Sequence, residues 1–169
     1  YPKSINKECT TNIINRLLKH SDGNVYAFCN RSVFKCSMNQ TVETVFPDIA
    51  IPSPTYSVAQ APDKDIYIGT ESNGLYIYSE NWKLKKHVPI DGIIATILPD
   101  NNGDIWLGLD ETGICLFNKN KQTFTWLHKD NTNLNNNSIR TFVSYGDSSI
   151  LVGTFRGLNI LNKKELTIT

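Results

Sequence analysis

The stretch Asn102-Gly103-Asp104-Ile105-Trp106-Leu107-Gly108 joins a turn to an apolar strand, and Gly113-Ile114-Cys115-Leu116-Phe117-Asn118 repeats that arrangement four residues later. Gly, Asn and Asp in such turns supply the backbone angles that tight hairpins need. The chain carries three further pairs of this kind, at residues 65–70 with 74–78, 150–154 with 157–161, and, less well preserved, 24–28 with 32–34. This internal repetition decides the fold.

The repeat has a regular length. When the copies are aligned on Tyr26, Tyr67, Trp106 and Leu151, each extends thirteen residues upstream without a gap, to Ile13, Pro54, Ile93 and Ser138. Successive copies therefore begin 41, 39 and 45 residues apart. A period of about 40–45 residues with four short strands per copy is typical of a β-propeller blade. The sequence predicts an all-β fold built of about four antiparallel, four-stranded copies.

Each copy is predicted to hold four strands in chain order, and the four blades span residues 13–46, 54–88, 93–128 and 138–169. The second strands, at 25–28, 66–69, 105–108 and 150–153, are apolar on both faces, which indicates burial between neighbouring blades. The fourth strands are more polar, which protects an exposed sheet edge. The remaining predicted strands are the first (13–18, 56–60, 93–98 and 139–144), the third (including 75–78 and 114–118) and the fourth (40–45, 82–87, 123–128 and 165–169).

One segment has a competing pattern. Residues 13–20 place apolar side chains at helical spacing, which taken alone favours an amphipathic helix. The same residues align without a gap with residues 93–100, which begin the third copy. We therefore predict a strand here.

Length and composition are compatible with one domain of 169 residues, of which 40% are hydrophobic and 20% charged. The net charge of +1 provides no basic surface for nucleic acid or for an anionic membrane. No run of about 18 apolar residues occurs that would span a bilayer, and the first residues lack the pattern of a signal peptide. This segment is therefore expected to bind neither nucleic acid nor a membrane.

The four cysteines, Cys9, Cys29, Cys36 and Cys115, lack the spacing of a metal site. Cys29 and Cys36 fall on neighbouring strands of one predicted hairpin and are candidates for a disulfide. The alternative is that all four are small apolar residues that fill gaps in the core. No metal and no cofactor are expected.

Three motifs carry a resemblance to a known family. Residues 137–140 (NSIR), 103–108 (GDIWLG) and 157–162 (GLNILN) resemble the repeat of two-component-regulator propellers. The likeness covers residues 13–169 and is weakest in the first copy, where Phe28 and Ser32 stand in place of glycines.

The resemblance implies the periplasmic sensor segment of a Bacteroides-type hybrid two-component system. In that family two seven-bladed propellers and an immunoglobulin-like domain precede a membrane span, and kinase, receiver and DNA-binding modules follow inside the cell. Such sensors typically detect oligosaccharides released from glycans. The chain is then a fragment of a larger seven-bladed propeller, residues 1–12 are the tail of a preceding blade, and a membrane is reached only through a downstream region.

Besides an oligosaccharide ligand, this interpretation predicts two possible partners. The first is a set of further propeller blades of the same protein, which would complete the ring. The second is another copy of the chain: without further blades, the isolated piece either stays an open arc or closes as a homodimer, because repeat units need neighbours to bury their apolar faces.

Loops at one end of the copies gather the candidate ligand-binding residues. In a four-stranded meander, the loop before the first strand and the loop between the second and third strands lie at the same end. Polar groups near an aromatic ring at that end suit a sugar, and a plain solvated loop surface is the alternative for each residue. Asp110 and Glu111 also form an acidic pair that can attract a cation. The candidates are Glu71, Asn73, Asp110, Glu111, Asn135, Asn137, Arg140 and Arg156.

No catalytic constellation is recognisable from spacing. His20, His87 and His128 lie far apart in the sequence and are expected at solvated edges. A glycoside hydrolase would need two converging carboxylates, and the sequence shows no such pair. The favoured function is a non-catalytic, ligand-sensing module, with a protein-interaction platform as the alternative and a propeller lyase or glycoside hydrolase as the third hypothesis. Trp106, Tyr67 and Tyr26 are expected in the core.

Overall fold

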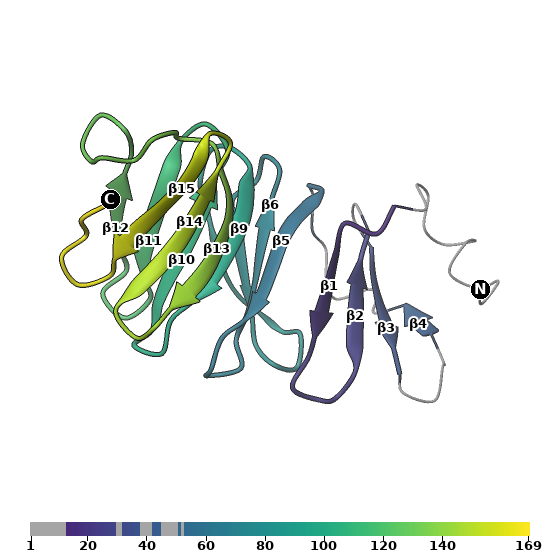
Figure 1. The fold of residues 1–169 in the computed structure, drawn as a ribbon. Coiled ribbons are helices and arrows are strands. Elements are labelled where there is room, and N and C mark those ends of the chain that lie inside the picture. Colours follow the sequence, from purple (N-terminus) through teal and green to yellow (C-terminus); the bar gives the residue numbers. More distant parts are fainter. Residues whose placement is uncertain (1–12, 30–31, 38–41, 45–50, 52) are drawn as a thin grey trace. The chain divides into compact units, whose positions relative to one another are not determined.

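The computed structural model describes residues 13–29, 32–37, 42–44, 51 and 53–169, and those residues form fifteen strands and no helix. The strands make four antiparallel sheets, three of four strands and one of three, and each sheet follows the chain order from one edge to the other (Figure 1). The all-β fold and its four antiparallel meanders are therefore as predicted.

The strand bounds lie close to those expected from the repeat. The first sheet consists of β1 (Arg16–Lys19), β2 (Val25–Phe28), β3 (Val33–Cys36) and β4 (Val42–Thr44). The second consists of β5 (Thr55–Gln60), β6 (Ile66–Thr70), β7 (Leu75–Tyr78) and β8 (Leu84–Val88). The third consists of β9 (Ile94–Pro99), β10 (Asp104–Leu109), β11 (Gly113–Asn118) and β12 (Thr123–Leu127). The fourth consists of β13 (Ile139–Tyr145), β14 (Ser149–Thr154) and β15 (Gly157–Asn162).

The segment with competing helix and strand patterns is a strand. Its extended part, β1, begins at Arg16 rather than at Ile13, and it pairs with β2 from Arg16 opposite Phe28 to Lys19 opposite Val25. Two of its apolar residues, Ile13 and Leu17, are exposed, by 57% and 66%. Pairing with β2 therefore decides the conformation, and the apparent helical stripe is not a buried face.

The predicted fourth strand of the last copy, at residues 165–169, is formed only in part, and its first two residues are wrong. Residues 163–165 form a turn, and Leu166 adopts a positive φ of 56°, which an extended strand cannot contain. Its last three residues pair with β15: the amides of Ile160 and Thr169 donate to each other's carbonyls at 2.7 and 3.0 Å, the Asn162 amide donates to the Thr167 carbonyl at 2.9 Å, and an isolated bridge joins Leu161 and Ile168. The fourth sheet therefore has three full strands over the described residues.

The repeat places Trp82 on a polar outer strand, but the residue lies in the turn before β8 with a φ of 61°. Its side chain turns inward: the residue is 8% exposed, and its ring centroid lies 4.6 Å from that of Tyr26. His20, expected at a solvated edge, is 4% exposed and stacks on Trp82 at 5.6 Å. Both corrections have one cause, because these rings close the same apolar core.

Cys29, Cys36 and Cys115 are free thiols. Cys36 lies opposite Val25, four residues along the neighbouring strand from Cys29. Four residues of strand span about 13 Å, roughly twice the distance between α-carbons that a disulfide bridges. Cys29 and Cys115 are buried, so they fill core gaps as the alternative interpretation held. Cys9 falls outside the described residues.

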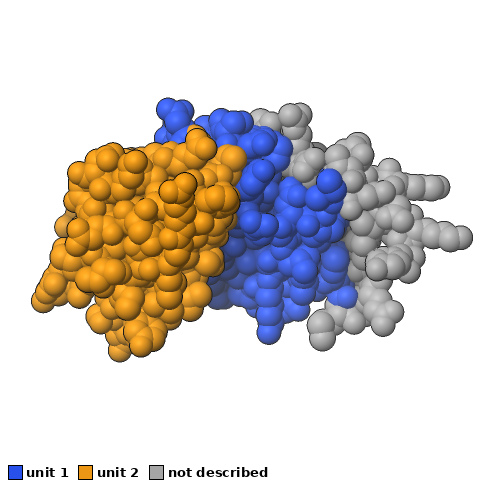
Figure 2. All heavy atoms as spheres, turned by 45° about the horizontal axis from the view of Figure 1, so that its top comes forward, with its two compact units in different colours: residues 1–91 blue, residues 92–169 orange. Residues whose placement is uncertain are grey.

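The chain divides into two compact units, residues 1–91 (unit 1) and residues 92–169 (unit 2), coloured separately in Figure 2. Each unit contains two sheets. We call the face of a sheet that carries the alignment residue of its second strand (Tyr26, Tyr67, Trp106 or Leu151) the forward face, and the opposite face the rear face.

Within each unit, the forward face of one sheet packs on the rear face of the next. In unit 1, Tyr26 and Phe28 of β2 share a buried cluster with Ile66 and Ile68 of β6. In unit 2, Trp106 and Ile114 share one with rear-face residues of β13–β15, and Figure 1 shows that sheet lying against β9–β12. The rear-face members in unit 2 are Ile139, Phe142, Ile150, Val152 and Leu161.

Candidate functional site at the strand-start edge

One edge of each sheet brings together the loops that were predicted to hold a ligand. The first strand begins, and the second strand ends, at this edge, which we call the strand-start edge. In three sheets a backbone hydrogen bond closes it: the amide of Glu71, Asp110 or Phe155 donates to the carbonyl of Pro54, Ile93 or Ser138, at 3.0, 3.0 and 2.9 Å. The predicted geometry of the loops is therefore present in these three sheets.

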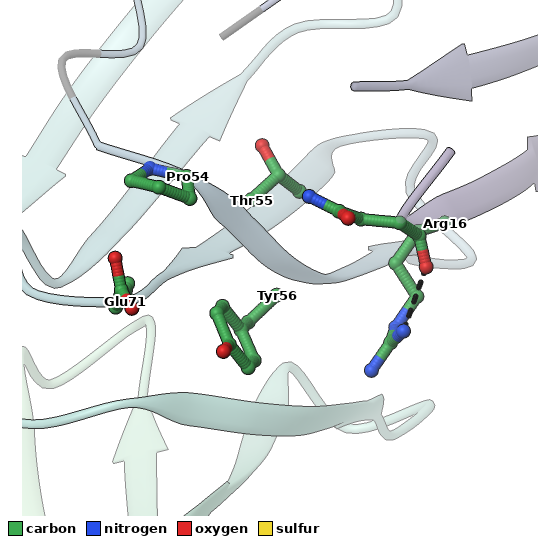
Figure 3. A pocket seen from close by; sticks show the side chains of 6 residues that line it. Arg16, Pro54, Thr55, Tyr56 and Glu71 are labelled. Atoms are coloured by element: carbon green, nitrogen blue, oxygen red, sulfur yellow. Dashed lines mark hydrogen bonds between the residues drawn. The ribbon is translucent and has the colours of Figure 1, made fainter. Parts of the chain in front are cut away.

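A pocket of about 360 Å³ opens at the strand-start edge of unit 1. Figure 3 shows the ring of Tyr56 between the side chains of Glu71 and Arg16 in that view. Tyr56 is half-buried, whereas Arg16 and Glu71 are exposed. The pocket is lined by Asn15, Arg16, Pro54, Thr55, Tyr56 and Glu71.

The pocket has the volume and chemistry for a small polar ligand. Ligand pockets in proteins occupy about 300–1,000 Å³, so this one lies at the small end of the range. A phenol ring supplies a flat apolar surface and a hydroxyl, a carboxylate accepts hydrogen bonds, and a guanidinium donates them. The Arg16 Nη1 atom donates to the Asn15 carbonyl at 2.7 Å, which holds the guanidinium against its own strand.

Asn73, another predicted ligand-binding residue, is engaged in holding its turn. Its Nδ2 atom donates to the Tyr76 hydroxyl at 2.7 Å, and its amide donates to the Thr70 hydroxyl at 3.0 Å. Its carbonyl accepts from His87 Nε2 at 2.7 Å, and the His87 ring stacks on Tyr76 at 4.4 Å. Burial raises the pKa of Tyr76, although the bond from Asn73 opposes that shift. Asn73 therefore shapes the turn rather than facing a ligand.

At the strand-start edge of unit 2, Arg140 joins three elements. Its Nη1 atom lies 3.2 Å from Asp110 Oδ2, and its guanidinium lies over the Phe155 ring at 5.3 Å. The Arg140 side chain is 47% exposed and that of Asp110 22%, so the pair is open to solvent. Such exposed pairs contribute little stability, and the guanidinium keeps donors free for a ligand.

The remaining predicted residues of unit 2 divide into loop-forming and exposed ones. Asn135 Oδ1 accepts from the Thr154 hydroxyl at 2.8 Å, and Asn137 Oδ1 accepts from the Lys129 amide at 2.8 Å, so both asparagines fix the loop before β13. Glu111 sits in the β10–β11 turn with a φ of 66° and is exposed, as is Arg156. Glu111 and Arg156 therefore stay candidates for ligand binding only because their side chains are exposed.

Sequence reasoning missed most of the unit 1 pocket. Asn15, Tyr56 and Arg140 occupy the same position of the repeat, and only Arg140 was singled out. The alignment could therefore have identified Asn15 and Tyr56, because residues at one repeat position lie beside the same loops in every copy. Arg16, Thr55 and Pro54 are adjacent to these positions and line the pocket through chain continuity.

In the described part of the chain, no three or more His, Cys, Asp and Glu side chains gather in a group that would suit a metal ion. Over the same residues, no helix has the length and apolar character needed to cross a bilayer.

No protein-family model and no curated protein matches the chain. Two structures of the extracellular domain of BT4673 from B. thetaiotaomicron, named as a one-component and as a hybrid two-component system, match with TM-scores of 0.75 and 0.77 at 18% and 16% identity. They align with 93% and 94% of this chain, but with only 21% and 24% of their own length. Virginiamycin B lyase from Staphylococcus aureus matches with a TM-score of 0.67 at 16% identity, over 90% of this chain and 53% of the lyase.

These similarities concern the fold. The chain consists of β-propeller-type sheets like those of the BT4673 extracellular domain and of the lyase, and it spans less than a quarter of the BT4673 structures.

Proposed function

We propose that this chain is a non-catalytic, ligand-sensing segment of the periplasmic ectodomain of a hybrid two-component sensor, and that it binds glycan-derived oligosaccharides. The observation that carries the proposal is the pocket at the strand-start edge of unit 1, which Arg16, Tyr56 and Glu71 line. The fold similarity to the BT4673 extracellular domain supports a sensor role. The family resemblance of the repeats supports the choice of a sugar as ligand.

The composition of the pocket favours binding of a neutral, polyhydroxylated molecule. A sugar presents an apolar ring face edged by hydroxyl groups, and an aromatic side chain beside hydrogen-bonding groups matches that combination. Ligand binding would then shift the balance between arrangements of the full receptor, which is how a binding site signals to a distant module.

The carboxylates at the pocket favour binding of a sugar without cleavage. Glycosidic hydrolysis uses two carboxyl groups about 5–9.5 Å apart. Glu71 is the one carboxylate among the described residues that line the pocket. A propeller lyase shares the fold at 16% identity, which by itself says nothing of chemistry because one fold hosts many activities.

A glycan array followed by calorimetry on the best ligand tests the proposal. We expect binding by the unaltered chain, at least about 10-fold weaker binding by Tyr56→Ala, and unchanged binding by Thr125→Ala on the exposed strand β12, since about 1.4 kcal/mol of lost contact is tenfold in affinity. The sugar should be recovered intact. Recovery of shortened products would move the assignment to an enzyme, and no binding to any glycan would favour the second candidate.

That second candidate is a protein-interaction platform, and the forward face of β13–β15 favours it. Val143 and Leu158 on this face are 55% and 64% exposed. Exposed apolar patches of this kind mark contact surfaces.

A further inference from the structure

Tyr56, one of the residues that line the pocket of unit 1, lies on a β-bulge. The pairing of β5 with β6 includes Thr55 and Ser57 but skips Tyr56 between them. The same irregularity skips Ala95 in β9 and Arg140 in β13, which occupy the same repeat position. Bulges are common beside functional sites because they redirect a side chain. The bulge is therefore a constant feature of three copies, and in unit 1 it presents a phenol ring to the pocket.

Thr55, which precedes the bulge and also lines the pocket, departs from the repeat. The residues aligned with it are Ile14, Ile94 and Ile139. Thr55 is 1% exposed, and its hydroxyl has no hydrogen-bond partner among the described residues. Buried polar groups normally have a partner, and departures from what the fold favours are expected at functional sites. This departure favours a functional pocket over an incidental gap between strands.

Two opposite charges line the pocket without neutralising each other. The Arg16 guanidinium donates one hydrogen bond, from Nη1 to the Asn15 carbonyl at 2.7 Å, and keeps its other donors for a ligand. Among the residues that the structure describes, none forms a hydrogen bond or an ion pair with the Glu71 carboxylate. The other lining residues are uncharged. The charges therefore balance, which favours a neutral ligand group that has both a donor and an acceptor.

The ring of Tyr56 lies between these two charged groups in the view of Figure 3. Arg16 belongs to β1 in the first sheet, whereas Glu71 follows β6 in the second sheet. The Glu71 amide donates to the Pro54 carbonyl at 3.0 Å, which fixes the backbone of that loop. A ligand group that stacks on the ring therefore meets hydrogen-bond donors on one side and an acceptor on the other.

A secondary amide has the chemistry that this arrangement requires. Its bond is planar and trans, so its N–H and C=O groups point in opposite directions. The N–H can donate to the Glu71 carboxylate while the carbonyl accepts from the Arg16 guanidinium, and such bonds to charged groups are stronger than neutral ones. The flat amide and its methyl group can pack on the Tyr56 ring. In a sugar, this group is the acetamido substituent.

We propose that the pocket of unit 1 recognises N-acetylated amino sugars through their acetamido group. This inference rests on the proposed function, because it specifies which class of sugar binds. Arg16 holds the acetamido carbonyl, Glu71 holds the acetamido N–H, and Tyr56 stacks on the amide plane. A sugar with a hydroxyl at the same carbon lacks the carbonyl and the methyl group, so it loses the contact with Arg16 and most of the contact with Tyr56.

Calorimetry with matched sugars tests this specificity. The pairs are N-acetylglucosamine with glucose and N-acetylgalactosamine with galactose, and the members of each pair differ only in the group at one carbon. We expect at least one acetamido sugar to bind at least about 10-fold more tightly than its partner, the value of one hydrogen bond to a charged group. Glucosamine, which keeps the nitrogen but lacks the acetyl group, should also bind at least about 10-fold more weakly than N-acetylglucosamine if the latter is the ligand.

Variants of the two charged residues test their roles. Glu71→Ala and Arg16→Ala should each reduce the preference for the acetamido sugar towards one, which a merely structural role would not do. Glu165→Ala is the matched control, because Glu165 is an exposed carboxylate in the turn after β15, outside the pocket. It should leave the preference unchanged. Circular dichroism of each variant verifies that it is folded.

The outcomes separate this inference from the proposed function. Equal affinity for both members of each pair, tight binding of glucosamine, or an unchanged preference in Glu71→Ala and Arg16→Ala would overturn the acetamido assignment. So would a glycan array on which the chain binds only glycans without acetamido groups, although the proposed sugar-sensing function would then stand. An array on which no glycan binds would overturn both.

Discussion

Ile139, the first residue of β13, packs against Gly108 of β10 so closely that no side chain fits between them. A β-carbon at Gly108 would lie 2.5 Å from Ile139 Cγ2 and 3.0 Å from Ile139 Cβ. The backbone of Gly108 does not adopt a positive φ, so the glycine is required by the approach of two sheets rather than by a turn. The glycine near the end of the second strand thus allows the neighbouring sheet to pack closely.

Gly108→Ala is expected to lower the free energy of unfolding by about 1–3 kcal/mol, the cost of overpacking a filled core. Urea denaturation measures it. Gly153→Ala is the matched control, because its β-carbon would clash only with Thr141 of the same sheet, and a smaller loss is expected. Combined with Ile139→Ala, which removes the buried side chain that the new methyl group would meet, Gly108→Ala should cost less than the sum of the two single losses, because neighbouring changes are coupled. Equal losses at the two glycines would contradict an inter-sheet role.

Trp82→Ala is expected to destabilise unit 1 by about 3–5 kcal/mol, as for other buried aromatic residues. The Trp82 ring lies 4.6 Å from Tyr26 and 6.1 Å from Phe28, between the two sheets of that unit. Denaturant unfolding followed by circular dichroism measures the effect. Trp126→Ala on β12 provides the comparison, because Trp126 is only half-buried. A smaller loss at Trp82 than at Trp126 would contradict its place in the core.

Much of the fold could be predicted from the sequence because the sequence contains four copies of the same four-stranded repeat. Agreement among copies overrode the helical spacing of residues 13–20, and it placed β10 and β14 within one residue of their observed bounds. The predictions failed for Trp82, His20 and residues 165–166, because the alignment transfers strand positions, whereas these residues depend on one particular core or turn. Pattern alone does not show that Trp82 turns inward.

The candidate site was less predictable for a related reason. The loops at the strand-start edge followed from the meander, but the role of each side chain depends on its hydrogen bonds. Asn73, Asn135 and Asn137 are held by their own turns and loops. Tyr56 shares the repeat position of the candidate Arg140, but the sequence does not show whether an aromatic side chain at that position is buried or open. Its half-buried place in the pocket that Glu71 also lines makes it a candidate for ligand contact.

Asp22→Asn is expected to lower stability at pH 7 by about 1–2 kcal/mol, because bonds to charged groups are strong and exposure weakens them. Burial opposes ionisation of Asp22, but hydrogen bonds from Asn24, Tyr26 and His20 outweigh it and hold the pKa of Asp22 well below its usual range. The Tyr26 hydroxyl donates to Asp22 Oδ2 at 2.9 Å. A lowered carboxyl pKa stabilises the fold above the unfolded pKa and ceases to do so as pH falls towards the folded pKa.

The pH dependence provides the check on this interpretation. The difference between the unaltered chain and Asp22→Asn should therefore shrink as pH falls below about 4, the pKa of a free aspartate. Asp147→Asn, in the exposed β13–β14 turn, should leave stability nearly unchanged. Thermal melts from pH 7 to pH 3 measure both variants. A difference that grows on acidification would show that the sign of the pKa shift is wrong.

Asn73→Ala should lower stability by about 1–3 kcal/mol by leaving the Tyr76 hydroxyl without its donor, whereas Glu71→Gln should leave stability unchanged. The amide of Asn73 reaches the Tyr76 hydroxyl at 2.7 Å, and Glu71 is exposed. Urea denaturation separates the two effects. If Glu71→Gln were the more destabilising change, Glu71 would be a structural residue and not a candidate for ligand contact.

The most direct test of the account is an NMR titration of the ¹⁵N-labelled chain with the sugar that binds best. The predicted result is a set of saturable shift changes at Arg16, Thr55, Tyr56 and Glu71 around the pocket of unit 1, with the sugar unchanged at the end. Shift changes confined to outer strands such as β8 and β12, or a sugar cleaved during the titration, would contradict it.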